Sequence, residues 1–295
     1  MSIKLIVTDM DGTLLNENIE VTNRAREAIL KAQNAGIDFA VATGRTVESG
    51  YSLIKEQGIT CPFIELNGAR LFDENERLQF TRQMKKDDVK TLVDILNHYD
   101  VHNQFITQEG TYTNRTMEDY ILSFKAVFKN INKSLTEEEA AAYATERMEK
   151  FKVNMVDNYD FLHLDTGIQV LKSMANAGDD LNLLREVQNT VEEELPDLIV
   201  TSASTLNIEI NHVHANKGKA VAEYAESKGY SADEVITIGD NINDLTMLEW
   251  SNHSYAVANG HDFAKEAANY IAPSHADDAV AQIIERVVGE KSLVF

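Results

Sequence analysis

The sequence predicts an α/β protein in which a doubly wound, Rossmann-like core of parallel strands is split by an inserted α+β domain. At both ends of the 295-residue chain, short apolar runs rich in β-branched residues alternate with segments of helical spacing. That alternation is typical of parallel strands buried on both faces. Between about residues 84 and 211, strand-like segments instead alternate apolar and polar side chains. This second pattern is typical of an antiparallel sheet with one polar face.

The N-terminal part of the core is expected to read strand, helix, strand, helix, strand. Residues 3–8 (IKLIVT) form a strand-like run, and residues 22–35 carry alanine and isoleucine at helical spacing. Thr22 is suited to cap this helix and Gly36 to end it. The next elements are expected to be a strand over 37–43, a helix over about 47–57 and a short strand over 62–66.

The C-terminal part repeats this order. The expected elements are a helix over 217–228, a strand over 234–239, a helix over 243–250, a strand over 254–258, a helix over 262–268, a short strand near 270–271 and a closing helix over 276–288. In the middle, a polar helix is expected within 133–151 and alternating strands over 151–156, 198–203 and 205–211, whereas the pattern of 157–175 favours no element. The predicted core therefore comprises 1–83 and 212–295, and the predicted insertion comprises 84–211.

The composition excludes several classes of partner. The net charge is −21 and no run of lysine and arginine is present, which argues against nucleic acid and against anionic membranes. A phosphate site on such a chain has to be locally cationic. The single cysteine, Cys61, cannot form an intrachain disulfide, and no apolar stretch approaches the roughly 20 residues of a membrane span. A cytoplasmic protein is expected, and the sequence does not indicate its oligomeric state.

The first motif with chemical meaning is DMDGTL (9–14), directly after the first predicted strand. Side chains two residues apart on extended chain point the same way, so Asp9 and Asp11 can converge beyond the carboxyl end of the strand. Ligands of open α/β sheets bind at that edge. One carboxylate then suits a nucleophile and metal ligand, and the other suits a general acid or base. An ordinary acidic turn has the same sequence, and the motif alone does not decide.

Two motifs follow the ends of other predicted strands. Thr43 and Gly44, in ATGR (42–45), offer a hydroxyl and backbone N–H groups to phosphate oxygens at the start of a helix. In GDNIND (239–244), three side chains offer the hard oxygen donors that suit Mg²⁺: Asp240, Asn243 and Asp244. Each motif alone also fits a turn with a helix cap.

Lys217 opens a predicted helix after the alternating strands. Its ammonium group can neutralise Asp9 and a phosphate oxygen, although a lysine at a helix start is also an ordinary solvated charge. Asn216 precedes it and can cap the helix. His212 and His214 lie just upstream, where they fit either metal ligands or solvated linker residues.

The four motifs together, in the order DxDGT, TGR, lysine and GDxxND, closely resemble the haloacid dehalogenase superfamily of phosphotransferases. Within it, the chain resembles the Cof-type phosphatases, which carry a large C2-type cap between the second and third motifs. The resemblance covers the whole chain. It implies an Mg²⁺-dependent phosphatase that hydrolyses a small phosphorylated metabolite, such as a sugar phosphate, through an aspartyl-phosphate intermediate.

The resemblance also implies a role for each matching residue. Asp9 is the nucleophile, and Asp11 is the acid and base. Thr43, Gly44 and Lys217 bind the phosphoryl group. Mg²⁺ is held by Asp9, the backbone carbonyl of Asp11 and Asp240. Asn243 and Asp244 support these ligands, and Arg45 and Asn67, the latter in ELNGA (65–69), line the substrate site.

Two other functions remain open at this stage. A phosphosugar mutase can share this fold and this pair of acids, and would differ in needing a bisphosphate and retaining phosphate. A non-catalytic binding or regulatory protein can retain the fold, although none of the motifs is degraded here.

Overall fold

The computed structural model describes residues 2–122, 125, 136–150, 152–178, 180–204 and 207–289. The chain divides into two compact units, a core unit of Met1–Arg82 and His214–Phe295 and an inserted unit of Gln83–Val213. The inserted unit begins one residue before the predicted insertion and ends two residues after it. Parts of three predicted elements lie outside the described residues: 133–135, 151 and 205–206.

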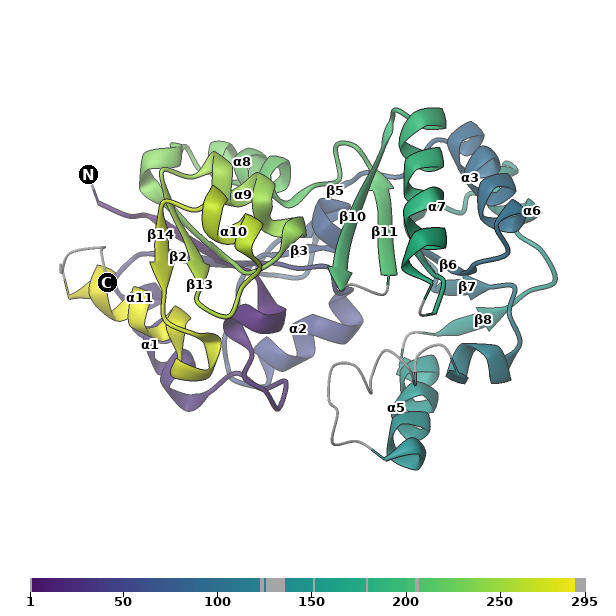
Figure 1. Ribbon diagram of the computed structural model, residues 1–295. Coiled ribbons are helices and arrows are strands. Elements are labelled where there is room, and N and C mark those ends of the chain that lie inside the picture. The colour runs from purple at the N-terminus through teal and green to yellow at the C-terminus, as the bar shows by residue number, and fades with distance from the viewer. Residues whose placement is uncertain are drawn as a thin grey trace. The chain divides into compact units, whose positions relative to one another are not determined.

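The core unit is built on one eight-stranded sheet in the order β14-β13-β12-β1-β2-β3-β4-β5 (Figure 1). Six strands are parallel: β1 (Leu5–Thr8), β2 (Asp38–Ala42), β3 (Phe63–Glu65), β12 (Val235–Gly239), β13 (His253–Val257) and β14 (Tyr270–Ala272). An antiparallel hairpin that the sequence pattern did not indicate, β4 (Arg70–Phe72) and β5 (Leu78–Thr81), completes one edge. The strand order reverses at β1, so the carboxyl ends of β1, β2 and β12 lie side by side.

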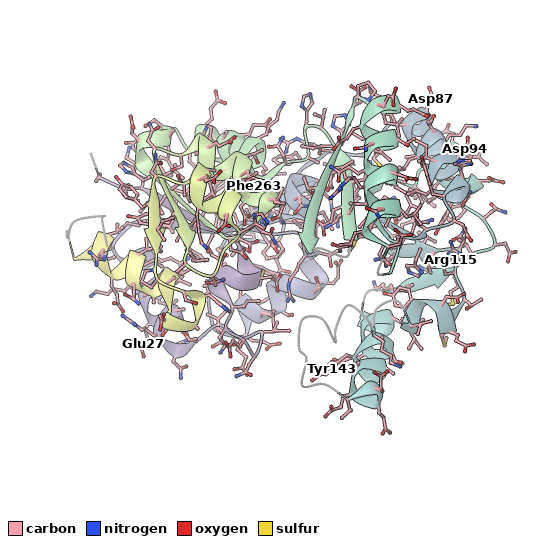
Figure 2. The ribbon with its side chains drawn as sticks, in the orientation of Figure 1. Glu27, Asp87, Asp94, Arg115, Tyr143 and Phe263 are labelled. Atoms are coloured by element: carbon pink, nitrogen blue, oxygen red, sulfur yellow. The ribbon has the colours of Figure 1, made fainter. Side chains whose placement is uncertain are left out.

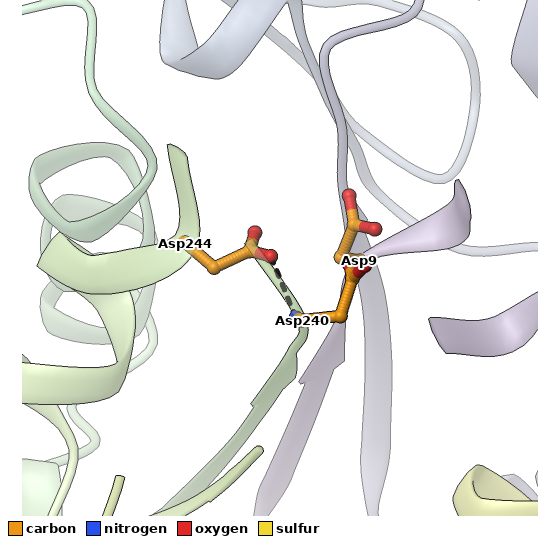
Figure 3. A group of neighbouring side chains, drawn as sticks. All are labelled: Asp9, Asp240 and Asp244. Carbon is orange, nitrogen blue, oxygen red and sulfur yellow. Dashed lines mark hydrogen bonds between the residues drawn. The ribbon is translucent and has the colours of Figure 1, made fainter. Parts of the chain in front are cut away.

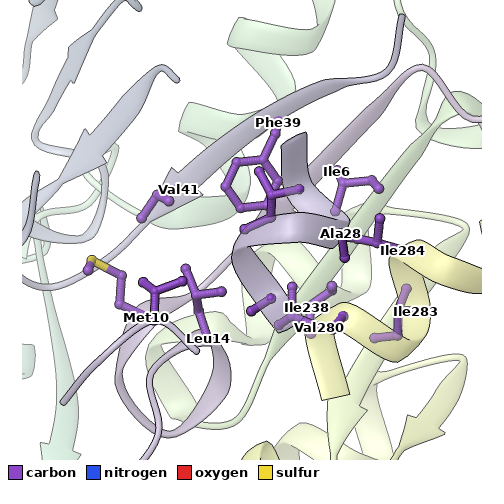
Figure 4. Close-up of a cluster of buried hydrophobic side chains, with 14 of the residues drawn as sticks. Ile6, Met10, Leu14, Ala28, Phe39, Val41, Ile238, Val280, Ile283 and Ile284 are labelled. Atoms are coloured by element: carbon purple, nitrogen blue, oxygen red, sulfur yellow. The ribbon is translucent and has the colours of Figure 1, made fainter. Parts of the chain in front are cut away.

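Helices cover both faces of this sheet. One face carries α1 (Asn23–Asn34), α2 (Val47–Lys55) and α11 (Ala279–Val288), and the other carries α8 (Lys217–Ser227), α9 (Leu245–Trp250) and α10 (Asp262–Ala267). The side chains of successive β1 residues point to opposite faces of the sheet, so they belong to two different apolar layers. Ile6 packs among residues of α1 and α11 (Figure 4), whereas Leu5 and Val7 pack among residues of α8 and α9. Burial on both faces explains the nearly continuous apolar strands and confirms the predicted doubly wound class.

The ends of α1 follow from single residues. The Thr22 hydroxyl accepts a hydrogen bond from the backbone N–H of Ala25 at 3.1 Å, which satisfies one of the free donors of the first turn. After the helix, Gly36 has a φ of 82°, a left-handed conformation that glycine adopts without steric cost. Both features agree with the prediction for this helix.

The inserted unit contains a six-stranded sheet in the order β10-β11-β9-β6-β7-β8. Its strands are β6 (His102–Thr107), β7 (Thr111–Thr113), β8 (Val153–Met155), β9 (Val170–Asn176), β10 (Leu198–Ser204) and β11 (Asn207–His212). Side chains of α3 (Lys86–His98), α6 (Asp160–His163) and α7 (Leu181–Glu194) pack on one face of this sheet. The opposite side of α3 is polar, and Asp87 and Asp94 point away from the sheet there (Figure 2). A further helix, α5 (Glu137–Lys150), lies between β7 and β8 in the chain.

The expectation of an antiparallel inserted sheet is wrong at β8. This strand pairs in parallel with β7, with Thr111 opposite Val153. The connection between the two strands is long enough for the crossover that a parallel pair requires. The segment 157–175, which the pattern left undecided, contains α6 and the first part of β9. In the described part of the chain, no helix combines the length and apolar character needed to cross a membrane.

Candidate active site

Three carboxylates meet at the carboxyl edge of the core sheet. Asp9 directly follows β1, Asp240 directly follows β12, and Asp244 ends the short 3₁₀ turn Ile242–Asp244 that comes next. Carboxylate oxygens of all three lie within 4.8 Å of one another (Figure 3). The two strands are neighbours in the sheet, with Thr8 paired to Ile238, and this register brings Asp9 and Asp240 together.

Lys217 joins this cluster from the first position of α8. Its Nζ donates to Asp9 Oδ1 at 2.6 Å and to Asp244 Oδ1 at 2.5 Å, and its side chain is fully buried. Asn216 caps the helix, as expected, by accepting from the backbone N–H of Lys219 at 2.8 Å. The start of α8 therefore presents an ammonium group to the carboxylates.

Gly218 allows that helix start to approach α9. A Cβ atom at Gly218 would overlap the backbone carbonyl of Thr246. The Gly218 N–H donates to the Thr246 hydroxyl at 2.9 Å, which fixes the contact. Only glycine permits this separation, because any other side chain would push the first turn of α8 away from α9.

The carboxylates outnumber their cation. Burial raises the pKa of Asp9 well above its ordinary value; Lys217 opposes that change, and the charges of Asp244, Asp240 and Asp11 add to it. Burial and then the charge of Asp244 raise the pKa of Asp240 to about 7. Burial lowers the pKa of Lys217, but Asp244 and Asp9 outweigh it, so the net pKa lies above the ordinary value and the ammonium stays charged. One positive charge thus faces three carboxyl groups, and their hard oxygen donors fit a divalent cation such as Mg²⁺.

The turn that carries the nucleophile candidate passes very close to Asp240. Gly12 has a φ of 76°, and a Cβ atom there would lie 2.5 Å from Asp240 Oδ2. The next residue, Thr13, donates its hydroxyl to Asp240 Oδ1 at 3.1 Å. Both the left-handed backbone and the space require glycine at this position.

Asp9 and Asp11 have different surroundings. The Asp11 side chain is 54% exposed, compared with 7% for Asp9. Arg45 forms two parallel hydrogen bonds with Asp11, from Nε to Oδ2 at 2.7 Å and from Nη2 to Oδ1 at 2.6 Å. Each carboxylate of the DxD pair therefore has its own cation, one buried and one near the surface.

Asn67 connects the turns that follow β2 and β12. Its backbone N–H donates to the Thr43 carbonyl at 2.9 Å, and its side-chain oxygen accepts from the amide of Asn243 at 3.2 Å. Asn67 is buried in a left-handed conformation with a φ of 60°, which asparagine tolerates better than most residues. The buried Thr43 hydroxyl accepts from the backbone N–H of Arg45 at 3.2 Å, with Gly44 between them in the turn.

Asp244 holds the backbone of the turn that carries Asp240. Its Oδ2 accepts from the N–H groups of Asp240 at 2.9 Å and Asn241 at 3.0 Å. With Oδ1 bonded to Lys217, both of its oxygens have protein partners. The structure thus places every residue proposed from the motifs at one edge of the core sheet: Asp9, Asp11, Thr43, Gly44, Arg45, Asn67, Lys217, Asp240, Asn243 and Asp244. His214 is exposed, and the cluster suited to a metal contains no histidine.

The motifs did not point to the loop after β13, which braces this edge. Asn259 donates its amide to the Gly12 carbonyl at 2.8 Å and accepts from the backbone N–H of His275 at 2.9 Å. The backbone N–H of His261 donates to the Asp240 carbonyl at 2.7 Å. The Asn-Gly pair at 259–260 signals a turn, but nothing local indicates that this turn contacts the loops that follow β1 and β12.

The site combines a buried carboxylate cluster, one ammonium group and a turn suited to binding phosphate. It lies at the switch point of a doubly wound sheet, and this arrangement is typical of a class of phosphoryl-transfer enzymes. The chain matches the haloacid dehalogenase-like hydrolase family over residues 6–284 and belongs to that family. The predicted superfamily, its Cof-type organisation and the predicted enzyme class, a phosphatase, are confirmed.

Known relatives match over nearly their whole length. The chain is 27% identical to the 5-amino-6-(5-phospho-D-ribitylamino)uracil phosphatase YcsE of Bacillus subtilis, covering 98% of this chain and 97% of the relative. It is 26% identical to the pyridoxal phosphate phosphatase YbhA of Escherichia coli, covering 96% and 98%. A solved haloacid dehalogenase-like hydrolase from B. subtilis superposes with a TM-score of 0.85 at 24% identity, covering 96% of this chain and 99% of that one, which shows a shared fold.

Proposed function

We propose that this phosphatase is Mg²⁺-dependent and hydrolyses small phosphorylated metabolites through an aspartyl-phosphate on Asp9. The observation that supports this most directly is the contact of Lys217 with Asp9 at 2.6 Å, inside a cluster of three carboxyl groups at the carboxyl edge of the sheet. A nucleophilic carboxylate needs such a cation to approach an anionic phosphate.

Asp9, Asp240 and the backbone carbonyl of Asp11 are the proposed ligands of Mg²⁺, with Asn243 and Asp244 in support. When bound, Mg²⁺ neutralises the clustered carboxylates and the charge on the transferring phosphate. The hydrogen bonds of Asp244 to Lys217 and to two backbone N–H groups suit a supporting role, since they already engage both of its oxygens.

The side chains of the core unit can then carry out both halves of the reaction. Lys217 orients Asp9, while the Thr43 hydroxyl and the backbone at Gly44 bind phosphoryl oxygens at the start of α2. An Asp9 oxygen bonds to phosphorus as the bond to the leaving oxygen breaks, and Asp11 gives that oxygen a proton. Asp11 then takes a proton from water, whose oxygen attacks phosphorus. This step releases inorganic phosphate and restores Asp9.

We propose that the substrate is a small phosphorylated metabolite. It resembles the compounds after which the relatives are named, 5-amino-6-(5-phospho-D-ribitylamino)uracil and pyridoxal phosphate, or is a sugar phosphate. We further propose that the inserted unit acts as the cap domain that the family resemblance implies, and that the enzyme works in the cytoplasm. Nucleic acid and membranes are not proposed as partners, given the net charge of −21.

The test is release of inorganic phosphate from about a hundred phosphorylated metabolites, ranked by kcat/KM. We expect turnover with Mg²⁺, loss of turnover with EDTA, and loss by several orders of magnitude in the Asp9→Ala and Asp240→Ala variants. Unchanged turnover in EDTA would refute the metal assignment. Transfer of phosphate within the substrate, without release, would instead indicate a mutase.

A further inference from the structure

Arg45 contacts a catalytic carboxylate through both of its oxygens. The Nε and Nη2 donors of Arg45 reach the two oxygens of Asp11 at 2.7 and 2.6 Å. A paired contact of this kind fixes the plane of the carboxylate as well as its position. Asp11 needs such a constraint, because its side chain is about half exposed and has no burial to select one rotamer.

Arg45 is itself held from several directions. Its Nη1 donates to the Ser49 carbonyl in α2 at 3.2 Å. Its backbone N–H donates to the Thr43 hydroxyl at 3.2 Å, and its carbonyl accepts from the N–H of Leu66 at 3.1 Å. The Arg45 side chain is 21% exposed, much less than that of Asp11. The guanidinium group is therefore oriented by α2 and by the turns around it.

We propose that Arg45 is a positioning residue for Asp11, which holds the Asp11 side chain in place for its reaction. When Asp11 carries the proton that it gives to the leaving oxygen, one of the two contacts opens and frees the protonated oxygen. This inference rests on the proposed function, since it assigns a role relative to the acid of that reaction. It differs from the expectation that Arg45 lines the substrate site, because a lining residue would act on the substrate directly.

The two roles predict different responses to the leaving group. A residue that acts through the general acid matters most for a poor leaving group, which cannot depart without a proton. A residue that binds the phosphate or the substrate body contributes equally for all leaving groups. The kcat/KM value is the right quantity, because it covers only the steps up to departure of the leaving group.

The experiment compares wild type, Asp11→Asn, Arg45→Lys and the double variant with p-nitrophenyl phosphate and phenyl phosphate. Lysine keeps the charge at position 45 but cannot form the paired contact. We expect Arg45→Lys to lower kcat/KM about 100-fold for phenyl phosphate and less than about tenfold for p-nitrophenyl phosphate. In the Asp11→Asn background, Arg45→Lys should cause little further loss, because the group it positions is already disabled.

Arg24→Lys is the matched control. Arg24 forms the same paired contact with Glu285, at 2.9 and 2.8 Å, on the surface of α1 and α11. This variant should leave kcat/KM unchanged for both substrates. If circular dichroism shows that Arg45→Lys is unfolded, Arg45→Gln replaces it, and its kcat/KM values for the two substrates are compared in the same way.

The positioning role would be overturned if Arg45→Lys lowered kcat/KM equally for both substrates. It would also be overturned if the decrease in kcat/KM added fully to that of Asp11→Asn. Either result would indicate that Arg45 contacts the substrate directly. Failure of the proposed function looks different. In that case the wild-type enzyme would not hydrolyse p-nitrophenyl phosphate with Mg²⁺, or Asp11→Asn would itself show no dependence on the leaving group.

Discussion

Asp9 is under opposing electrostatic influences. Burial and three neighbouring carboxylates favour its protonated form, and the Lys217 ammonium favours its ionised form. Removing a carboxylate from water without full compensation costs stability. At this position the proposed catalytic role and the requirements of folding therefore conflict.

The Asp9→Asn variant tests that conflict. We expect kcat to fall by about 10³-fold or more, because the proposed nucleophile is gone. In EDTA, thermal unfolding should show the variant to be more stable by about 1 kcal/mol, because an amide does not carry the cost of burying an ionisable carboxyl group. Asp262→Asn, at an exposed carboxylate, should change neither quantity. An Asp9→Asn variant less stable than wild type in EDTA would contradict this account.

Close approach between elements determines where the site residues lie. The contact of Gly218 with the backbone of Thr246 brings the start of α8 against α9, and Lys217 is delivered to Asp9 as a result. In the same way, Asn259 after β13 holds the Gly12 carbonyl, next to Asp240. These contacts explain why glycine and asparagine occupy positions that have no chemical role of their own.

Gly218→Ala should shift α8 and misplace Lys217. We expect a loss of about 1–3 kcal/mol in the free energy of unfolding, from overpacking against backbone, together with a fall in kcat of at least about tenfold. Urea unfolding and steady-state kinetics measure the two effects. Gly36→Ala is the matched control: no atom lies within 4 Å of its Cβ position, but its φ is 82°. It should cost about 1 kcal/mol and leave kcat unchanged.

Asn259→Ala removes the donor to the Gly12 carbonyl. We expect about 1 kcal/mol less stability and a decrease in kcat of about tenfold, with little change in substrate KM, since the loop that carries Asp9 and Asp11 loses a support. Asn252→Ala, which removes an exposed side-chain hydrogen bond to Asp233, is the control. A change in KM alone would indicate that Asn259 contacts substrate instead.

At the scale of the whole molecule, the two compact units contain different buried ionisable groups. In the inserted unit, burial and then the charge of Arg115 lower the pKa of His102 to about 4 from an ordinary value of 6.5. The unfolded chain therefore binds a proton at His102 at a higher pH than the folded chain does. The stability contributed by neutral His102 is present above about pH 6.5 and is lost as the pH falls toward 4.

His102→Phe keeps an aromatic ring beside Tyr120 and removes the titration. Between pH 7 and pH 4.5, wild type should lose up to about 3 kcal/mol more unfolding free energy than the variant, since one pKa unit corresponds to about 1.4 kcal/mol. Urea unfolding at the two pH values gives this difference, and carboxylates common to both proteins cancel. Parallel losses in the two proteins would show that His102 titrates normally.

The sequence by itself determined the doubly wound core and the positions of the motifs, because strand burial and helix capping depend on patterns of residues close together in the chain. Asp9, Thr43 and Asp240 each follow a buried strand, and parallel strands end at a common edge. Asn216, a residue suited to cap a helix, likewise predicted the helix start at Lys217.

Only the tertiary structure decided which of these residues touch. Lys217 and Asp9 are 208 residues apart in the chain, and their 2.6 Å contact depends on the approach of α8 to α9. The pairing of Arg45 with Asp11, the brace at Asn259 and the parallel pairing of β8 are also invisible to local pattern. The physical reason is that periodicity and capping report on neighbours along the chain, whereas these contacts depend on how whole elements pack.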